Sequence, residues 1–302
     1  MTRSRFLPPA AALLLLAGCA AHRAAQAPGT PHYVLEPAWQ ANGIWYYPHE
    51  SFSYDRTGLA SVYGGGHPAL TADGEAFDQD AMAAASQTLQ LPAIVRVTNL
   101  RNGRQVLARV NDRGPGRPGR TIELTRRTAG LLGIAPDEAG EVRVQVEDAP
   151  SRQLAAALQG EAGKLRIDTA PRGAVTAEAL PPPPGVPVSA RGRPATADAL
   201  ATIAAAQAPA LEIPLRLPET VTQTAPQPGR LWLRGSQFSR MEYARRQRAE
   251  LSGLNPQIER IREGRGEIYR LRAGPFPSVA AADAALDQAR ARGVTDARIT
   301  VE

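Results

Sequence analysis

The feature that most constrains the fold is a pair of alternating apolar segments on either side of an Asn-Gly turn. Residues 93–100 and 104–112 each alternate apolar and polar side chains, and Asn102 and Gly103 lie between them. Asn-Gly is a preferred two-residue connection between antiparallel strands, because both positions accept positive φ angles. The sequence therefore predicts a β-hairpin with one face of alternate side chains turned toward a core.

The second strand of this hairpin ends in a carboxylate beside a turn. Asp112 closes the alternating run, and Arg113, Gly114 and Pro115 follow it. Period-two alternation places Asp112 on the face of Val110, at the strand end, unless a bulge intervenes. A carboxylic acid at the end of a strand, beside a glycine turn, is a candidate catalytic residue. The plainer alternative is an Asx-type turn whose carboxylate accepts backbone N–H groups.

Two further strand-like segments extend this β pattern. Residues 120–125 and 141–147 alternate in the same way, and residues 125–134 between them predict a short helix. Short strands with little helix indicate a small β-barrel.

The N-terminus has the features of an export signal. Arg3 and Arg5 precede a short apolar run, which ends in LAGC with Cys19, the only cysteine of the chain. The run is too short for a stable transmembrane helix. We therefore expect a lipoprotein signal peptide over residues 1–18, cleaved before Cys19, which is then acylated. Ordinary signal cleavage nearby is the alternative, and a lone cysteine excludes an internal disulfide.

Composition divides the rest of the chain into four zones. Residues 19–54 form a mostly irregular N-terminal extension, and residues 55–150 hold the dense alternating pattern. Residues 151–227 are rich in Ala, Pro, Arg and Gln, and residues 228–302 recover a regular pattern. Because the third zone has few large apolar side chains, we expect a disordered linker there, with a transient helix near its start.

A weak internal repeat organises the last zone. Residues 231–238 and 269–276 align with Leu, Arg and Phe in register, and a predicted helix follows each. With strands at residues 258–263 and 297–302, the order is βαββαβ, which predicts a four-stranded antiparallel sheet backed by two helices. Leucines and an alanine would face the helices: Leu231, Leu233, Leu271 and Ala273. A tryptophan and three arginines would face solvent and could bind a sugar: Trp232, Arg234, Arg270 and Arg272.

Serines mark the predicted starts of the two helices in this zone. Ser239 and Glu242 have the spacing of a capping box, and Ser278 precedes the second helix as its cap.

These segments together resemble a known family. The N-terminal motifs, in their order and spacing, are similar to the double-psi β-barrel domain of the rare lipoprotein A family: GLASVYG, TADGEAFD, the segment from Leu91 to Pro115, and IELT. That family comprises periplasmic lytic transglycosylases acting at the division septum, and the resemblance covers roughly residues 38–148. The C-terminal zone resembles a SPOR domain, which binds septal peptidoglycan whose glycan strands have lost their stem peptides.

The resemblance implies a pair of catalytic carboxylates. Asp112 would be the central acid and Glu75 its partner, and no metal or cofactor is implied. A lytic transglycosylase protonates the leaving oxygen of the MurNAc–GlcNAc bond, and the C6 hydroxyl of the same sugar then closes on C1. One carboxylic acid that later acts as a base can suffice for this reaction. Arg113 is a further candidate, because pairing with Asp112 would lower the pKa of that acid.

Three positions depart from the family pattern. Ser86 stands where the family has a histidine thought to belong to its active site, Val62 replaces a tryptophan, and Glu123 replaces an aspartate. A serine hydroxyl can hold a substrate or a water molecule but does not shuttle protons near neutral pH. His67, in a glycine-rich loop, is the residue that could compensate, although loop histidines are usually solvated.

Two functions follow from these features. The first is an endolytic transglycosylase of denuded septal glycan strands, held to the outer membrane by a lipid anchor and facing the periplasm. The second is a non-catalytic septal lipoprotein whose barrel and SPOR domain only bind peptidoglycan. The formal charge of +6 does not indicate which kind of acidic partner the protein binds. Nucleic acid is disfavoured, because an export signal is present and the aromatic pattern of an RNA-binding βαββαβ module is absent. Septal protein partners stay undefined.

Overall fold

The computed structural model describes residues 29–35, 37–162, 216–264 and 266–302. The predicted signal peptide over residues 1–18, the lipidation site Cys19 and linker residues 163–215 lie outside the described residues. No helix among the described residues is both long and apolar enough to span a bilayer.

Six strands of the N-terminal domain close into a ring. They are β3 (Asp55–Val62), β4 (Ala83–Ser86), β5 (Ala93–Asn99), β6 (Arg104–Asp112), β7 (Arg120–Leu124) and β8 (Gly140–Val146). Their order is β4-β7-β3-β8-β5-β6, and β6 pairs again with β4. The β3–β7 and β4–β6 pairs are parallel, and the other four are antiparallel. Valine, leucine and alanine side chains fill the interior. The predicted small barrel is confirmed.

The central hairpin forms, but residues 100–103 connect its strands instead of Asn102 and Gly103 alone, and Asn102 does not have a positive φ. β5 and β6 pair in register with Val97 opposite Val106, and Gly103 in the turn has a φ of 76°. The ladder between β4 and β6 contains a register shift at the far end. Ala84 pairs with Val110, whereas the next residue of β4 pairs with Asp112. A bulge therefore interrupts the alternation just before Asp112 and sets its side chain apart from the regular core face.

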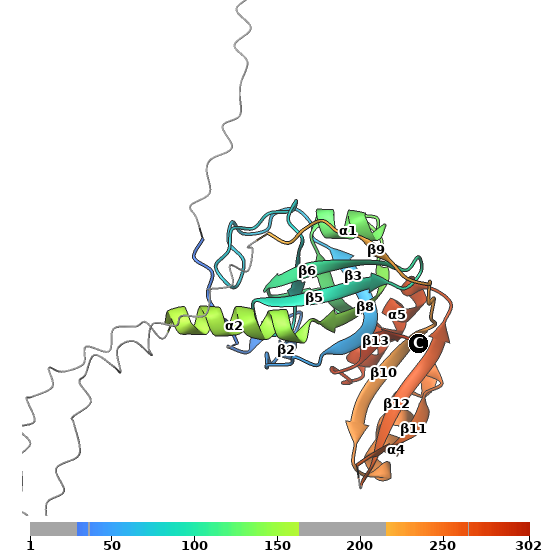
Figure 1. Cartoon of the computed structure of the whole chain (residues 1–302). Coiled ribbons are helices and arrows are strands. Elements are labelled where there is room, and N and C mark those ends of the chain that lie inside the picture. Colours follow the sequence, from blue (N-terminus) through green and yellow to red (C-terminus); the bar gives the residue numbers. More distant parts are fainter. Residues whose placement is uncertain (1–28, 36, 163–215, 265) are drawn as a thin grey trace, which may run out of the picture.

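The short helix α1 (Arg126–Leu132) lies where the sequence predicts it. Thr125 accepts a hydrogen bond from the Thr128 N–H at its start, and Gly133 ends it with a left-handed φ of 72°. Figure 1 shows α1 at one end of the barrel.

Two parts of the chain are more regular than the sequence predicts. The N-terminal extension is not irregular throughout, because β1 (Trp39–Ala41) and β2 (Ile44–Tyr46) form a hairpin. The predicted linker begins with the ordered helix α2 (Asp148–Ala162), which packs on β5. The Ser151 hydroxyl both accepts from the Ile94 N–H and donates to the Ile94 carbonyl oxygen. Near the end of the predicted linker, β9 (Thr222–Gln223) pairs with β6.

The C-terminal domain has the predicted βαββαβ order. It comprises β10 (Leu231–Phe238), α4 (Met241–Glu250), the 3₁₀ turn η1 (Ser252–Leu254), β11 (Gln257–Glu263), β12 (Gly266–Phe276), α5 (Val279–Ala291) and β13 (Arg298–Val301). The sheet order is β11-β12-β10-β13, with antiparallel neighbours. The four residues predicted to face the helices are buried: Leu231, Leu233, Leu271 and Ala273.

The cap predictions for this domain have opposite outcomes. The Ser278 hydroxyl accepts a hydrogen bond from the Ala281 N–H at the start of α5, as predicted. The capping box of Ser239 and Glu242 is wrong, because α4 begins only at Met241 and Arg240 occupies the cap position without a side-chain hydrogen bond.

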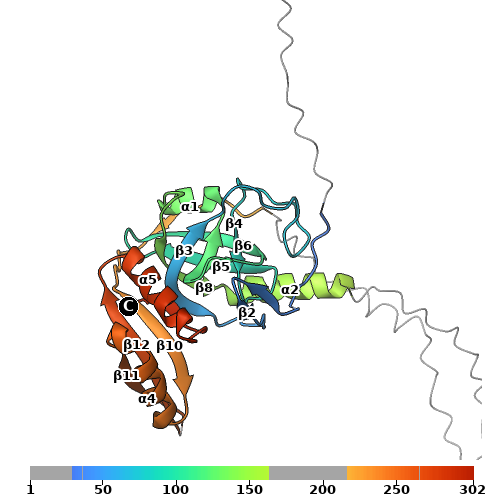
Figure 2. The ribbon, with the colours of Figure 1, turned by 180° about the vertical axis from the view of Figure 1, so that it is seen from behind.

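The two domains lie side by side, with β13 and α5 next to the barrel (Figures 1 and 2). The buried guanidinium of Arg120 donates two hydrogen bonds to the Asp283 carboxylate, at 2.6 and 2.8 Å. The Thr57 hydroxyl donates to the Val301 carbonyl oxygen at 2.6 Å. Gly119 makes this approach possible, since a Cβ atom there would lie 2.7 Å from Leu286.

Candidate active site

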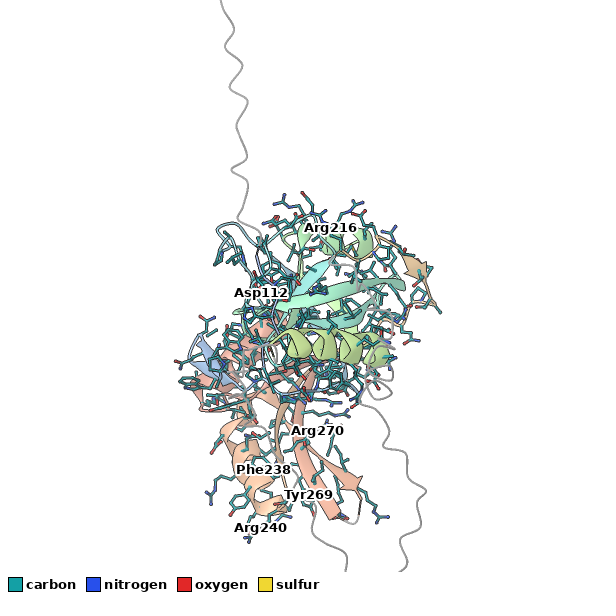
Figure 3. All side chains as sticks on the ribbon, turned by 60° about the vertical axis from the view of Figure 1, so that its left-hand side comes forward. Asp112, Arg216, Phe238, Arg240, Tyr269 and Arg270 are labelled. Atoms are coloured by element: carbon teal, nitrogen blue, oxygen red, sulfur yellow. The ribbon has the colours of Figure 1, made fainter. Side chains whose placement is uncertain are left out.

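Asp112 lies at the end of β6, in a nearly enclosed polar site. Its Oδ1 accepts a hydrogen bond from the Ala72 N–H at 2.8 Å, and its Oδ2 accepts one from the Tyr63 hydroxyl at 3.0 Å. The amide comes from a different loop, so the carboxylate does not cap its own turn as the Asx alternative requires. Figure 3 places Asp112 on the barrel, away from Phe238 and Tyr269 of the second domain.

His67 makes the shortest contact with this acid. Its Nε2 lies 2.6 Å from Asp112 Oδ2, and only 16% and 9% of the two side chains are exposed. The imidazole stacks on Phe77 with ring centroids 3.8 Å apart and meets the Tyr63 ring edge-on. The loop histidine is therefore held in place by aromatic rings instead of being solvated.

The hydrogen bonds of His67 define the proton content of the pair. His67 Nδ1 lies 2.8 Å from the Pro68 carbonyl oxygen, which can only accept, so Nδ1 carries a proton. Nε2 and Asp112 Oδ2, at 2.6 Å, also need a proton between them. The pair therefore holds this second proton either as carboxylic acid with neutral imidazole or as carboxylate with imidazolium. Either form has one transferable proton.

Glu75 is held on the other side of the β6 end. Its Oε1 accepts from the Arg109 Nε at 2.6 Å, and its Oε2 accepts from the Asn111 amide at 2.8 Å. The guanidinium of Arg109 is buried, and it forms an ion pair with the Glu75 carboxyl group. Glu75 is therefore not a freely exposed loop acid. Asp112 and Glu75 flank the same strand end but have different partners.

Asp73 of the same loop is a buried acid that sequence inspection did not single out. Its Oδ1 accepts from the Thr71 hydroxyl and the Glu75 N–H. Burial, followed by the charge of Glu75, raises the pKa of Asp73 to about 7. This carboxyl group braces the loop that carries Glu75.

Ser86 and Arg113 have surroundings that differ from those expected. The Ser86 hydroxyl is buried and accepts from the Thr88 and Leu89 N–H groups at 3.4 and 3.3 Å, which organises a turn. The Arg113 guanidinium donates to the Leu89 carbonyl oxygen at 2.6 Å, and none of the ion pairs among the described residues joins it to Asp112. Burial lowers the pKa of Arg113 to about 10.

Two more ionisable side chains complete the surroundings of Asp112. Burial and the negative charge of Asp112 raise the pKa of Glu123, which also lies against Gly114. Burial and the same charge raise the pKa of Tyr63, so its hydroxyl stays protonated and donates to Asp112. The group is thus a carboxylate–imidazole pair with one extra hydrogen-bond donor and one neighbouring acid.

A groove of about 1130 Å³ borders this group. Its wall includes Tyr63 and Phe77, which contact the Asp112–His67 pair, and also Glu75 with its two partners. Arg216, from the far end of the linker, lies at the rim and donates to Asp78 at 2.6 Å. A groove of this volume can hold sugar units, and the proton-bearing pair lies behind its aromatic wall.

The predicted sugar-binding face of the second domain is a network of charges. The Arg272 guanidinium lies 4.3 Å from the centre of the Trp232 ring and pairs with Glu259 at 2.8 Å. Arg234 pairs with Glu302, while Arg270 lies 3.5 Å from Glu259. These side chains lie on the face opposite the helices, as predicted, and are partly buried.

Comparisons with known proteins match both domains. Residues 55–146 match the family model described as lytic transglycolase, and residues 227–300 match the SPOR domain model. The chain is 35% identical over 241 residues to the endolytic peptidoglycan transglycosylase RlpA of Pseudomonas aeruginosa, covering 78% of this chain and 68% of that protein.

A second relative and one solved structure match shorter segments. The endolytic peptidoglycan transglycosylase RlpA of Yersinia pestis is 41% identical over 158 residues, which are 52% of this chain and 41% of that protein. The crystal structure of the RlpA SPOR domain from Pseudomonas aeruginosa aligns with 24% of this chain and 99% of that chain, at 21% identity and a TM-score of 0.23.

Proposed function

This chain belongs to the RlpA family of endolytic peptidoglycan transglycosylases, and on that premise we propose that it cleaves the MurNAc–GlcNAc bonds of denuded septal glycan strands, leaving 1,6-anhydro ends. The observation that carries the proposal is the Asp112–His67 pair, which holds a transferable proton beside a groove.

The proposed reaction needs two proton transfers, one from Asp112 and one back to it. Asp112, as a carboxylic acid, passes its proton to the oxygen that joins MurNAc C1 to GlcNAc while the C1–O bond breaks. The C6 hydroxyl oxygen of the same MurNAc then bonds to C1, and its proton returns to Asp112. No water is consumed. His67 shares the transferable proton with Asp112 before the first transfer and again after the C6 hydroxyl proton arrives, and Tyr63 fixes the orientation of the carboxyl group.

Glu75 has a different proposed role. Because Arg109 and Asn111 hold its side chain at the groove wall, Glu75 is placed to face the positive charge that develops on the sugar ring in the transition state. It need not carry a proton. Ser86 and Arg113 are proposed to support the site by holding the turn between β4 and β5.

Peptidoglycan is the proposed partner of the second domain as well. Family relationship and the SPOR match support a periplasmic protein of the cell wall that gathers at the division septum.

We further propose that Cys19 is lipidated and anchors the chain in the outer membrane. Changing Cys19→Ser should yield an unprocessed precursor or a soluble form. Unaltered partitioning into the detergent phase would contradict the anchor.

A second function is supported by Ser86 at the position of the family histidine. In that case the barrel binds glycan without cleaving it, and the protein is a non-catalytic septal lipoprotein. The contact between His67 and Asp112 favours the enzyme, because it gives the acid an imidazole partner from another loop.

Substituting the proposed acid separates these functions. Asp112→Asn keeps the shape but removes the proton donor, so release of anhydro-muropeptides from denuded sacculi should fall by about a hundredfold or more. The far-ultraviolet circular dichroism spectrum and glycan binding should stay unchanged. If wild type and variant both release no such products while both bind glycan, the barrel is a binding module.

A further inference from the structure

A cleft of about 1180 Å³ lies between the barrel and the second domain, and arginines from both domains line it. The barrel contributes Arg56 from β3, and the second domain contributes Arg234, Arg270 and Arg298 from three strands of its sheet. Arg270 is labelled in Figure 3. None of the sugar-binding residues predicted from the sequence lies on the barrel side of this cleft.

Arginines stand directly opposite one another across the sheet. Arg234 pairs in register with Arg298 of β13 on one side and with Arg272 of β12 on the other. Three positive side chains thus form one row on the same sheet face. Like charges directly opposite each other destabilise a sheet, so such a row needs compensating anions.

The described carboxylates compensate only part of this row. Glu302 pairs with Arg234 and Arg272, and Glu259 pairs with Arg272 as well. Among the described residues, no carboxylate pairs with Arg298 or with Arg56, whose guanidinium lies over the Tyr54 ring at 5.4 Å. Asp55, Asp296 and Glu302 also line the cleft but form no ion pair with Arg56 or Arg298, so within the described part of the chain these two charges stay unpaired at the junction of the domains.

The pKa of Arg298 also reflects the positive charge at the junction of the two domains. Partial burial in the cleft, then the charges of Arg56 and Arg234, lower the pKa of the Arg298 guanidinium. Arg56 and Arg298, from different domains, line the same cleft, so their positive charges share one space. An anion between them would compensate both charges.

Aromatic rings on the same wall indicate which anion fits. Tyr54 and the largely exposed Trp45 line the barrel side of the cleft. Flat aromatic faces stack on sugar rings, whereas guanidinium groups bind carboxylates through paired N–H donors. A simple phosphate headgroup has no sugar ring that could stack on these aromatic side chains.

We propose that Arg56 and Arg298 form a subsite for a carboxylate-bearing sugar of the glycan strand, shared between the barrel and the SPOR domain. This subsite rests on the proposed function, because it takes a muramic acid unit of the same denuded strand. One strand would contact both domains at once, so the domain that recruits the glycan also presents it to the barrel.

The test measures equilibrium binding of the full chain to soluble glycan strands stripped of stem peptides. Asp112→Asn serves as the background, so that no strand is cut. Arg298→Gln and Arg56→Gln should each weaken binding by about tenfold. Arg101→Gln removes the same charge at the exposed β5–β6 turn and should change binding less than about twofold. Strands whose carboxylates are converted to neutral amides should bind weakly and equally to all variants.

Three outcomes would overturn the subsite. In the first, the two variants bind stripped strands as tightly as the background protein does. In the second, they lose as much affinity for amidated strands as for stripped ones. In the third, they lose affinity only for vesicles of phosphatidylglycerol, which would make the cleft a lipid site. Thermal melting provides a folding control. Arg298→Gln should melt at the same temperature or higher, because it removes a repelled charge. If anhydro products are never found while this binding pattern holds, the proposed catalysis fails and the subsite stands.

Discussion

At the scale of single residues, the proton shared by Asp112 and His67 determines what the barrel can do. Nothing in the strand pattern places His67 there, because its contact with Asp112 depends on how a glycine-rich loop folds over the end of β6. The position of Asp112 at a strand end was predictable from alternation. The ion pair of Glu75 with Arg109 was not, since it joins residues 34 apart in sequence.

Replacing His67 tests whether its imidazole holds the proton that it shares with Asp112. His67→Gln keeps a donor near Asp112 but cannot hold the shared proton, so activity on denuded sacculi should fall by roughly tenfold to a hundredfold. The pH profile of the remaining activity should also change, which a purely structural role would not cause. His49→Gln, an exposed histidine, is the matched control and should retain full activity.

The stability of the protein should depend on pH through Asp73. The pKa of Asp73 is about 7 in the folded protein and about 4 in an unfolded chain. The folded state therefore keeps a proton that the unfolded chain releases, and this group's contribution to stability falls as pH rises through that range. Asp73→Asn should flatten this decline and melt at a higher temperature than wild type at pH 8. An unchanged slope in melts between about pH 5 and pH 8 would contradict the buried protonated acid.

At the scale of elements, alternation and turn chemistry predicted the barrel strands and the βαββαβ order. Helix boundaries depended on more than local spacing. Ser239 fails as a cap because α4 begins only at Met241, three residues after β10 ends at Phe238, so Arg240 occupies the cap position. The order of α2 was missed because it comes from packing on β5 through Ser151 and Leu154, whereas its local composition is that of a linker.

The two serines provide a matched test of helix capping. Ser278→Ala removes the acceptor for the Ala281 N–H and should lower the free energy of unfolding by about 1 kcal/mol. Ser239→Ala removes no cap and should leave it unchanged. Denaturant melts that show equal losses for both variants would contradict this assignment.

At the scale of the whole molecule, the two domains pack through an ion pair that sequence patterns do not reveal. Arg120 is 2% exposed at its side chain and forms a two-pronged contact with Asp283 of α5. Asp283→Asn should leave a buried charge without its anion and loosen the domains. Hydrogen exchange in β13 should then accelerate while the barrel core stays protected. Asp287→Asn, exposed on the same helix, should leave exchange in β13 unchanged.

The central claim is that the barrel cuts glycan by moving a proton and closing a ring within one sugar. Digesting denuded sacculi in water enriched in heavy oxygen, followed by mass spectrometry of the released sugars, tests it directly. We expect products that end in 1,6-anhydro-MurNAc with no heavy oxygen incorporated, and about a hundredfold less of them from Asp112→Asn. Products that carry heavy oxygen at C1 would show hydrolysis and contradict the mechanism, and the absence of any product from wild type would contradict catalysis.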